Sequence, residues 1–139
     1  MTFEHEGSIA TTASPAAIWR LWSDTGTWAQ WDPPVERVVL DGPFRIGTTG
    51  TLTLAGGIEA PFELTVVRAE ERYVDRLTLG ELVIDIDHRV EAHGDGALVT
   101  VHTTIEGPGA DQIGPMVTAD APVALAALVA MAEAPAPVA

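Results

Sequence analysis

The chain has 139 residues, of which 47% are hydrophobic, and its 20 acidic residues against seven basic ones give a net charge of −13. This charge repels phosphate backbones and anionic lipid surfaces, so we expect no nucleic-acid partner. Because cysteine is absent, disulfides, thiolate chemistry and cysteine-based metal sites are excluded.

The length is typical of one domain, which we place over residues 1–134, with a flexible C-terminal tail over 135–139. The first six residues lack the basic and then apolar segments of a signal peptide, so a cytoplasmic location is the default expectation. No linker, low-complexity run or internal repeat interrupts the pattern that follows.

The first elements are a strand and two short helices, expected at about 3–11, 15–22 and 24–31. Ser14 before Pro15 is typical of an N-cap followed by proline at the first helical position. Asp24 is a candidate N-cap for the second helix, and Pro33 prevents that helix from continuing. All four tryptophans lie in this region, within thirteen residues.

Turn residues divide the next stretch into six strands, expected at about 35–41, 48–55, 62–69, 72–79, 82–92 and 97–106. Glycine comes first in the two-residue loop Gly80-Glu81, which suits a type II′ hairpin and sets Tyr73 opposite His88. The next turn, at Gly94-Asp95-Gly96, allows two central pairs. Both of them place even-numbered residues of one strand opposite odd-numbered residues of the other.

Alternation along the strands separates an inner face of the sheet from an outer face. The outer face receives His102, near Asp87 and Arg89. Among aliphatic residues, the inner face is expected to carry four polar side chains, Tyr73, Asp75, His88 and Thr103.

A helical segment is expected after Gly107-Pro108-Gly109, and its apolar part covers residues 121–132. This part is too short to cross a bilayer unaided, so we expect no membrane insertion. Because it is apolar on nearly every side, it should be buried by protein around most of its circumference. Gly114-Pro115 and Pro122 predict a break or kink in its first half.

The order of these elements resembles the START-like (SRPBCC) superfamily and, within it, the polyketide cyclase/dehydrase-like proteins. Besides residues 14–33, the resemblance is carried by the turns at 42–44 and 47–50, by Asp87-His88 and by 106–108. It implies an α+β helix-grip fold, in which a curved antiparallel sheet of six or seven strands wraps a long C-terminal helix, with a cavity between them. It implies no single function, because the superfamily holds carriers, sensors and enzymes on one scaffold.

Tyr73, Asp75 and His88 are the candidates for acid–base chemistry. A carboxylate beside an imidazole can orient it and stabilise its charge, which leaves His88 as a general base or a ligand hydrogen-bonding group. Burial raises the pKa of Asp75 and a close histidine opposes that rise, so the protonation state stays open. The alternatives are a polar cluster that sets strand register, or a bulge that turns Asp75 outward. Asp32 is expected to cap local backbone N–H groups.

A molecule in the cavity is expected to contact residues of both the sheet and the helices. We expect no cofactor. We also expect no metal site, because alternation sends Asp85 and Asp87 to the face opposite His88. The candidate ligand-binding residues are Trp31, Tyr73, Asp75, Ile84, Ile86, His88, Val101, Thr103, Leu125 and Leu128.

Three functions are compatible with this pattern. The first is binding of a small hydrophobic molecule, lipid-, aromatic- or polyketide-like, by a monomer or homodimer. The second is a cyclase or dehydratase in which His88, assisted by Tyr73 or Asp75, moves a proton. The third is a non-catalytic, dimeric interaction protein. An open pocket of about 300 Å³ or more favours the first two, and a filled interior favours the third.

Overall fold

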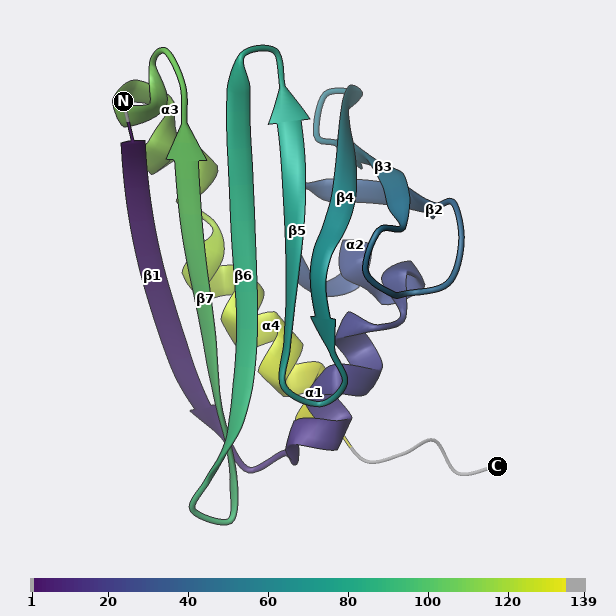
Figure 1. Cartoon of the computed structure of the whole chain (residues 1–139). Helices are drawn as coiled ribbons and strands as arrows, with labels where there is room; N and C mark the ends of the chain where they lie inside the picture. Colours follow the sequence, from purple (N-terminus) through teal and green to yellow (C-terminus); the bar gives the residue numbers. More distant parts are fainter. Residues whose placement is uncertain (1, 135–139) are drawn as a thin grey trace.

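The structure, a computed structural model, describes residues 2–134, and within them seven antiparallel strands form one curved sheet with the helices on its concave side (Figure 1). The expected tail, 135–139, lies outside the described residues. The elements are β1 (Thr2–Thr11), α1 (Pro15–Trp22), the 3-10 helix η1 (Thr25–Thr27), α2 (Trp28–Trp31), β2 (Val35–Leu40), β3 (Thr49–Leu54), β4 (Ile58–Arg68), β5 (Arg72–Leu79), β6 (Leu82–His93), β7 (Gly96–Glu106), α3 (Ala110–Val117) and α4 (Ala121–Glu133).

The strand order in the sheet is β1-β7-β6-β5-β4-β3-β2, so every strand after β1 pairs with its neighbour in sequence. β1 is the exception, because it pairs with β7 at the far end of the strand region. The expected helix-grip architecture is therefore confirmed, with seven strands in the described part of the chain.

Two glycine-led turns determine the register of the central strands. Gly80 has φ 60° and Gly94 has φ 57°, and each is the first residue of a two-residue loop. Glycine adopts this left-handed conformation without the steric cost that other residues meet. Tyr73 consequently lies opposite His88, as expected, and Asp87 lies opposite His102.

A bulge in β5 would have turned Asp75 outward, but the bulge lies in the neighbouring strand, β4. The β4–β5 register shifts between Leu64 and Val66, which makes Thr65 the extra residue of a bulge in β4. β5 itself pairs with β6 without interruption. Asp75 therefore stays on the concave face, and its exposed fraction is 3%.

The first helices begin at the expected caps. The side chain of Ser14 accepts a hydrogen bond from the backbone N–H of Ala17, and that of Asp24 accepts one from Gly26. The second helix is shorter than expected, because η1 occupies its first turn and α2 covers only Trp28–Trp31.

The expected break at Gly114-Pro115 is wrong. α3 continues through both residues, and the chain breaks instead at 118–120, between α3 and α4. Gly114 lets α3 approach β1 closely, since a Cβ there would come within 2.2 Å of the Phe3 ring. Pro122 lies in the first turn of α4, where its missing N–H removes no helical hydrogen bond.

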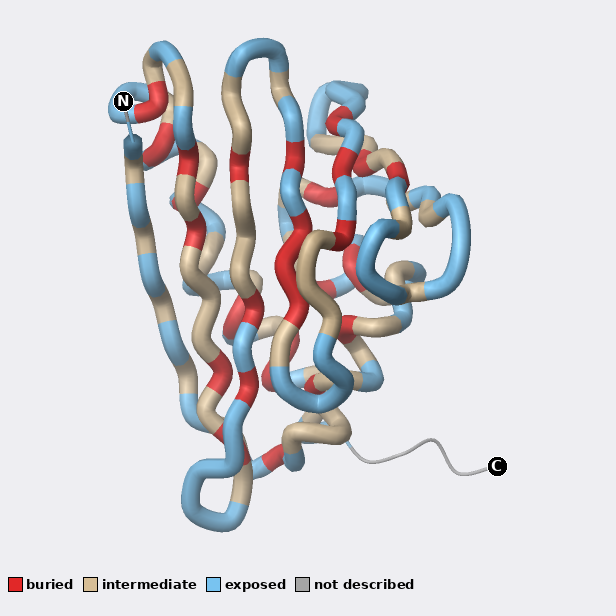
Figure 2. Tube along the Cα trace, in the orientation of Figure 1, coloured by how far each residue is buried: buried red, intermediate tan, exposed pale blue. Residues whose placement is uncertain are grey.

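By length and composition alone, Ala110–Glu133 could cross a membrane. In the structure, this stretch is divided into α3 and α4. Leu125, Leu128 and Val129 of α4 belong to the buried interior of the protein. The expected burial of these three residues is thus observed. Figure 2 shows, by contrast, that the turns at the ends of the sheet are largely exposed.

Leu128 should be one of the most sensitive positions in α4, because its exposed fraction is 1%. Leu128→Ala should lower the free energy of unfolding by about 2–5 kcal/mol through lost burial and the cavity left behind. Val123 of the same helix is 56% exposed, so Val123→Ala should cost less than about 0.5 kcal/mol. Urea unfolding of both variants checks this, and equal losses would contradict the packing described.

Candidate functional site

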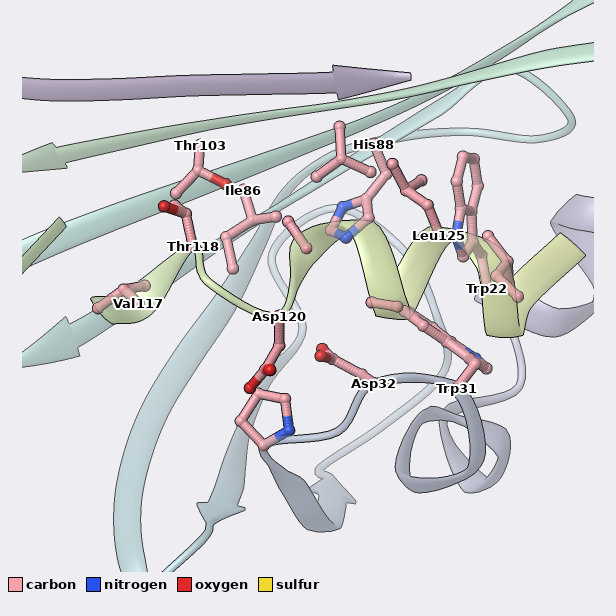
Figure 3. A pocket seen from close by; sticks show the side chains of 15 residues that line it. Trp22, Trp31, Asp32, Ile86, His88, Thr103, Val117, Thr118, Asp120 and Leu125 are labelled. Carbon is pink, nitrogen blue, oxygen red and sulfur yellow. The ribbon is translucent and has the colours of Figure 1, made fainter. Parts of the chain in front are cut away.

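A cavity of about 80 Å³ lies between the concave face of the sheet and the C-terminal helices (Figure 3). One water molecule needs about 10–15 Å³ of such a cavity, so this cavity has room for about five to eight water molecules. It is smaller than the roughly 300 Å³ expected for a drug-sized ligand. The interior is therefore neither filled nor widely open.

Aromatic side chains occupy much of the space that a larger cavity would need. Tyr73, which is 1% exposed, lies at the centre of this cluster. The ring of Trp28 stacks on it at a centroid distance of 5.7 Å, and Trp22 meets it edge-on at 5.5 Å. Phe44 approaches from another side at 5.3 Å. This cluster limits the depth of the cavity.

Seven of the ten expected ligand-binding residues line the cavity. Those that do not are Tyr73, Asp75 and Ile84. Tyr73 and Asp75 pack behind or beside His88, while Ile84 is buried farther along β6, opposite Leu77 and Ile105. The seven that line it are Trp31, Ile86, His88, Val101, Thr103, Leu125 and Leu128.

His88 forms one wall of the cavity and is held between two aromatic rings. It stacks flat on Tyr73, with ring centroids 3.9 Å apart and planes 6° from parallel. Trp22 meets the imidazole edge-on at 5.6 Å. Burial lowers the pKa of His88 to about 4. The imidazole is therefore neutral at pH 7.

Asp75 lies beside His88 without a hydrogen bond to it. Asp75 Oδ1 is 3.7 Å from His88 Nδ1, and neither atom has a hydrogen-bond partner within residues 2–134. Burial, with a smaller contribution from the charge of Asp32, raises the pKa of Asp75 to about 8. Both shifts favour a neutral acid beside a neutral base at pH 7.

Asp32 has a role that the sequence did not predict. Its side chain lines the cavity, and within residues 2–134 its carboxylate accepts no hydrogen bond from a backbone N–H, so the expected capping is wrong. Burial, and after it the charge of Asp120, raises the pKa of Asp32 to about 6. Figure 3 shows the carboxylates of Asp32 and Asp120 pointing toward one another.

The remaining lining residues come mainly from the loop after α2 and from the α3–α4 turn. The sequence offered no signal for them, because the break between α3 and α4 was expected elsewhere. They are Trp22, Asp32, Pro34, Val117, Thr118, Asp120, Ala121 and Ala124.

Side-chain hydrogen bonds hold the α1–α2 corner of the cavity in place. The indole N–H of Trp31 donates to Thr27 Oγ1 at 3.1 Å. Thr27 Oγ1 in turn donates to the carbonyl oxygen of Leu21 at 2.7 Å. The indole N–H of Trp28 donates to the carbonyl oxygen of Trp22 at 2.9 Å. Trp31 is therefore fixed to α1 while one side of its ring lines the cavity.

The outer face carries a separate polar group. His102 Nε2 lies 3.3 Å from Glu4 Oε1, and His102 Nδ1 lies 3.3 Å from Glu6 Oε1. The side chain of His102 is 36% exposed. This places His102 on the convex side, as expected. Within residues 2–134 no group of three or more His, Asp or Glu side chains could hold a metal ion.

A family model described as "Polyketide cyclase / dehydrase and lipid transport" matches residues 2–133 of the chain. No curated protein matches the sequence. Solved structures with the same fold exist in number, although their sequences are distant.

Three of these structures illustrate the range of proteins that share this fold. Norcoclaurine synthase from Thalictrum flavum is 16% identical with a TM-score of 0.77, and the match covers 98% of this chain and 96% of that one. Protein MLL2253 from Mesorhizobium loti is 11% identical with a TM-score of 0.81, covering 93% and 96%. The di-domain ARO/CYC StfQ from the steffimycin biosynthetic pathway is 12% identical with a TM-score of 0.79, covering 96% and 51%. At these identities the likeness shows the fold alone.

The buried Asp75–His88 pair should make stability depend on pH. The folded protein holds the Asp75 proton more tightly than the unfolded chain does, because the pKa rises from 3.8 to about 8. The stability gained from this proton is complete below the ordinary pKa of Asp75, 3.8, and is lost as the pH rises through 8. The contribution of His88 to stability rises with pH instead, since its pKa is lowered from 6.5 to about 4. Its contribution is complete above pH 6.5.

Between pH 6.5 and 8, the change in stability that comes from this pair should therefore be due to Asp75 alone. The free energy of unfolding should fall by about 1–2 kcal/mol over this range, and Asp75→Asn should abolish that fall. Urea unfolding at several pH values measures it. The control is Asp95→Asn, which changes an exposed carboxylate in the turn between β6 and β7. A wild-type profile that is flat, or one that Asp75→Asn leaves unchanged, would contradict the buried, protonated state.

Proposed function

The chain belongs to the polyketide cyclase / dehydrase and lipid transport family, and from this premise we propose that it binds one small, largely apolar molecule in the cavity between the sheet and α4. A single observation carries the proposal. One buried nitrogen atom of a cavity-lining residue, Trp22 Nε1, lacks a hydrogen-bond partner within residues 2–134. Buried polar groups nearly always have partners, so a polar group from a bound molecule would complete this site.

The walls of the cavity suit an apolar body with a few polar atoms. Ile86, Val101, Leu125 and Leu128 supply aliphatic surface whose burial against a ligand is favourable. His88 supplies the polar contact. Since Nδ1 lies on the Asp75 side, Nε2 is the ring nitrogen through which His88 would reach a ligand.

The size of the cavity restricts the ligand further. A cavity with room for about five to eight water molecules can hold a molecule with about that number of non-hydrogen atoms. A complete polyketide chain or a long lipid does not fit this conformation. We therefore favour a single-ring or short-chain ligand, bound in the cytoplasm by a monomer or homodimer.

Proton transfer by His88 is the second function that the site supports. A neutral imidazole can accept a proton, and a carboxyl oxygen of Asp75 beside it can accept a hydrogen bond from the imidazolium that forms. The observation that favours it is the 3.7 Å separation of these two buried groups at the cavity wall. The third alternative, an interaction protein, was expected with a filled interior and is supported less well by a cavity of 80 Å³.

Native mass spectrometry of freshly purified protein would identify a ligand that copurifies. Affinity for a ligand of the expected size, benzyl alcohol, can be measured by calorimetry. His88→Phe keeps a ring stacked on Tyr73 and removes both nitrogens, so it should weaken binding by about 1–3 kcal/mol. If the site is catalytic, the same change should reduce turnover by about 10²–10⁴.

The control for this test is His102→Phe, which changes a histidine on the convex face and should leave the affinity for benzyl alcohol unchanged. Circular dichroism verifies that both variants fold. Equal affinities of wild type and folded His88→Phe would reduce His88 to a structural residue.

A further inference from the structure

We propose that the molecule bound in the cavity carries a positively charged amine, which lies between Asp32 and Asp120 at the mouth while its apolar part extends inward to His88. This inference rests on the proposed function, because it names the chemical class of the ligand for the same cavity. It is carried by the two carboxylates at the mouth, by the apolar walls behind them and by the unpartnered Nε1 of Trp22, which lines the cavity.

The mouth combines two carboxylates from separate parts of the chain. Asp32 follows α2, and Asp120 precedes α4, yet both side chains line the cavity and point toward one another (Figure 3). Asp120 is exposed and Asp32 is half-buried, so they lie on the solvent side of the cavity, which is its mouth. Within residues 2–134, neither carboxylate forms an ion pair or a side-chain hydrogen bond. The ion pairs of Arg72, Arg76 and Arg89 lie instead on the convex face with Asp85 and Asp87.

The two carboxylates oppose each other electrostatically. The pKa of Asp32 is raised to about 6, first by burial and then by the charge of Asp120. Like charges close together disfavour ionisation, and a cation between them reverses that effect. An ammonium group would therefore be attracted to both carboxylates and would hold Asp32 ionised.

The inner end of the cavity supplies the second, independent indication that a ligand binds here. Trp22 is fully buried and lines the cavity, and its Nε1 has no hydrogen-bond partner within residues 2–134. The cavity thus has an acidic entrance and an interior lined mainly by aliphatic and aromatic side chains. A short amphiphilic amine matches this sequence of environments.

The charge of the lining and of the whole chain favours a cation over an anion. No arginine is among the residues that line the cavity. A net charge of −13 also attracts cations toward the protein from a distance and repels anions. A carboxylate or phosphate ligand would meet repulsion at the mouth with no cationic partner inside.

The test uses two probes of the same size and shape that differ in charge, benzylamine and benzyl alcohol. Calorimetry at pH 7.5 and low salt should show benzylamine binding about tenfold more tightly, since hydrogen bonds to charged groups are the stronger ones. Asp32→Asn should reduce this preference to threefold or less, and Asp120→Asn should reduce it partly. Added salt should weaken the binding of benzylamine more than that of benzyl alcohol.

The matched control is Asp111→Asn, which removes an exposed carboxylate from the first turn of α3, away from the cavity lining. It should leave the preference unchanged. Equal affinity for the two probes would overturn the amine inference and leave the proposed function standing. Binding of neither probe would overturn both. A benzylamine preference that survives Asp32→Asn and Asp120→Asn would overturn the placement of the amine.

Discussion

The stacking of Tyr73 on His88 is the contact on which the interior of this protein depends. Its geometry follows from the chain, because the Gly80-Glu81 turn brings the two residues directly opposite each other on adjacent strands. Once the imidazole is stacked 3.9 Å from the phenol ring, the remaining aromatic rings pack around that pair. The shape of the cavity follows from this arrangement.

The same packing explains why the cavity is small. Trp22 and Trp28 reach the concave face from α1 and α2 and pack on Tyr73. Their rings fill the part of the interior nearest the first helices, and the open space remains toward α3 and α4. A protein with this fold can thus be adapted to small ligands by a few bulky residues in one short segment, without a change in the sheet.

Much of the architecture could be predicted from local signals. The two glycine-led turns and the alternation of apolar residues gave the correct pairing of Tyr73 with His88, because a two-residue loop permits little freedom in register. The caps at Ser14 and Asp24 gave the starts of the first helical segments, because each satisfies backbone N–H groups nearby in sequence.

The cavity could be predicted only in part. Ile84 and Ile86 share one face of β6, but only Ile86 lines the cavity, and the difference depends on sheet curvature and helix placement. The inward direction of Asp32 and the break at 118–120 depend on how loops pack against helices far away in sequence. Gly114, which suggested a break, instead allows the close approach of α3 to Phe3.

The position of β1 has a consequence for the order in which the protein can be assembled during synthesis. β1 emerges first from the ribosome, but its hydrogen-bonding partner is β7, whose residues 97–106 are made about ninety positions later. The hairpins from β2 to β7 can form one after another as the chain lengthens, since each needs only its neighbour. The N-terminal strand must remain unpaired until nearly all of the sheet exists. Its alternating exposed and half-buried side chains, with charged Glu4 and Glu6 among the exposed ones, limit its tendency to pair with other chains during that interval.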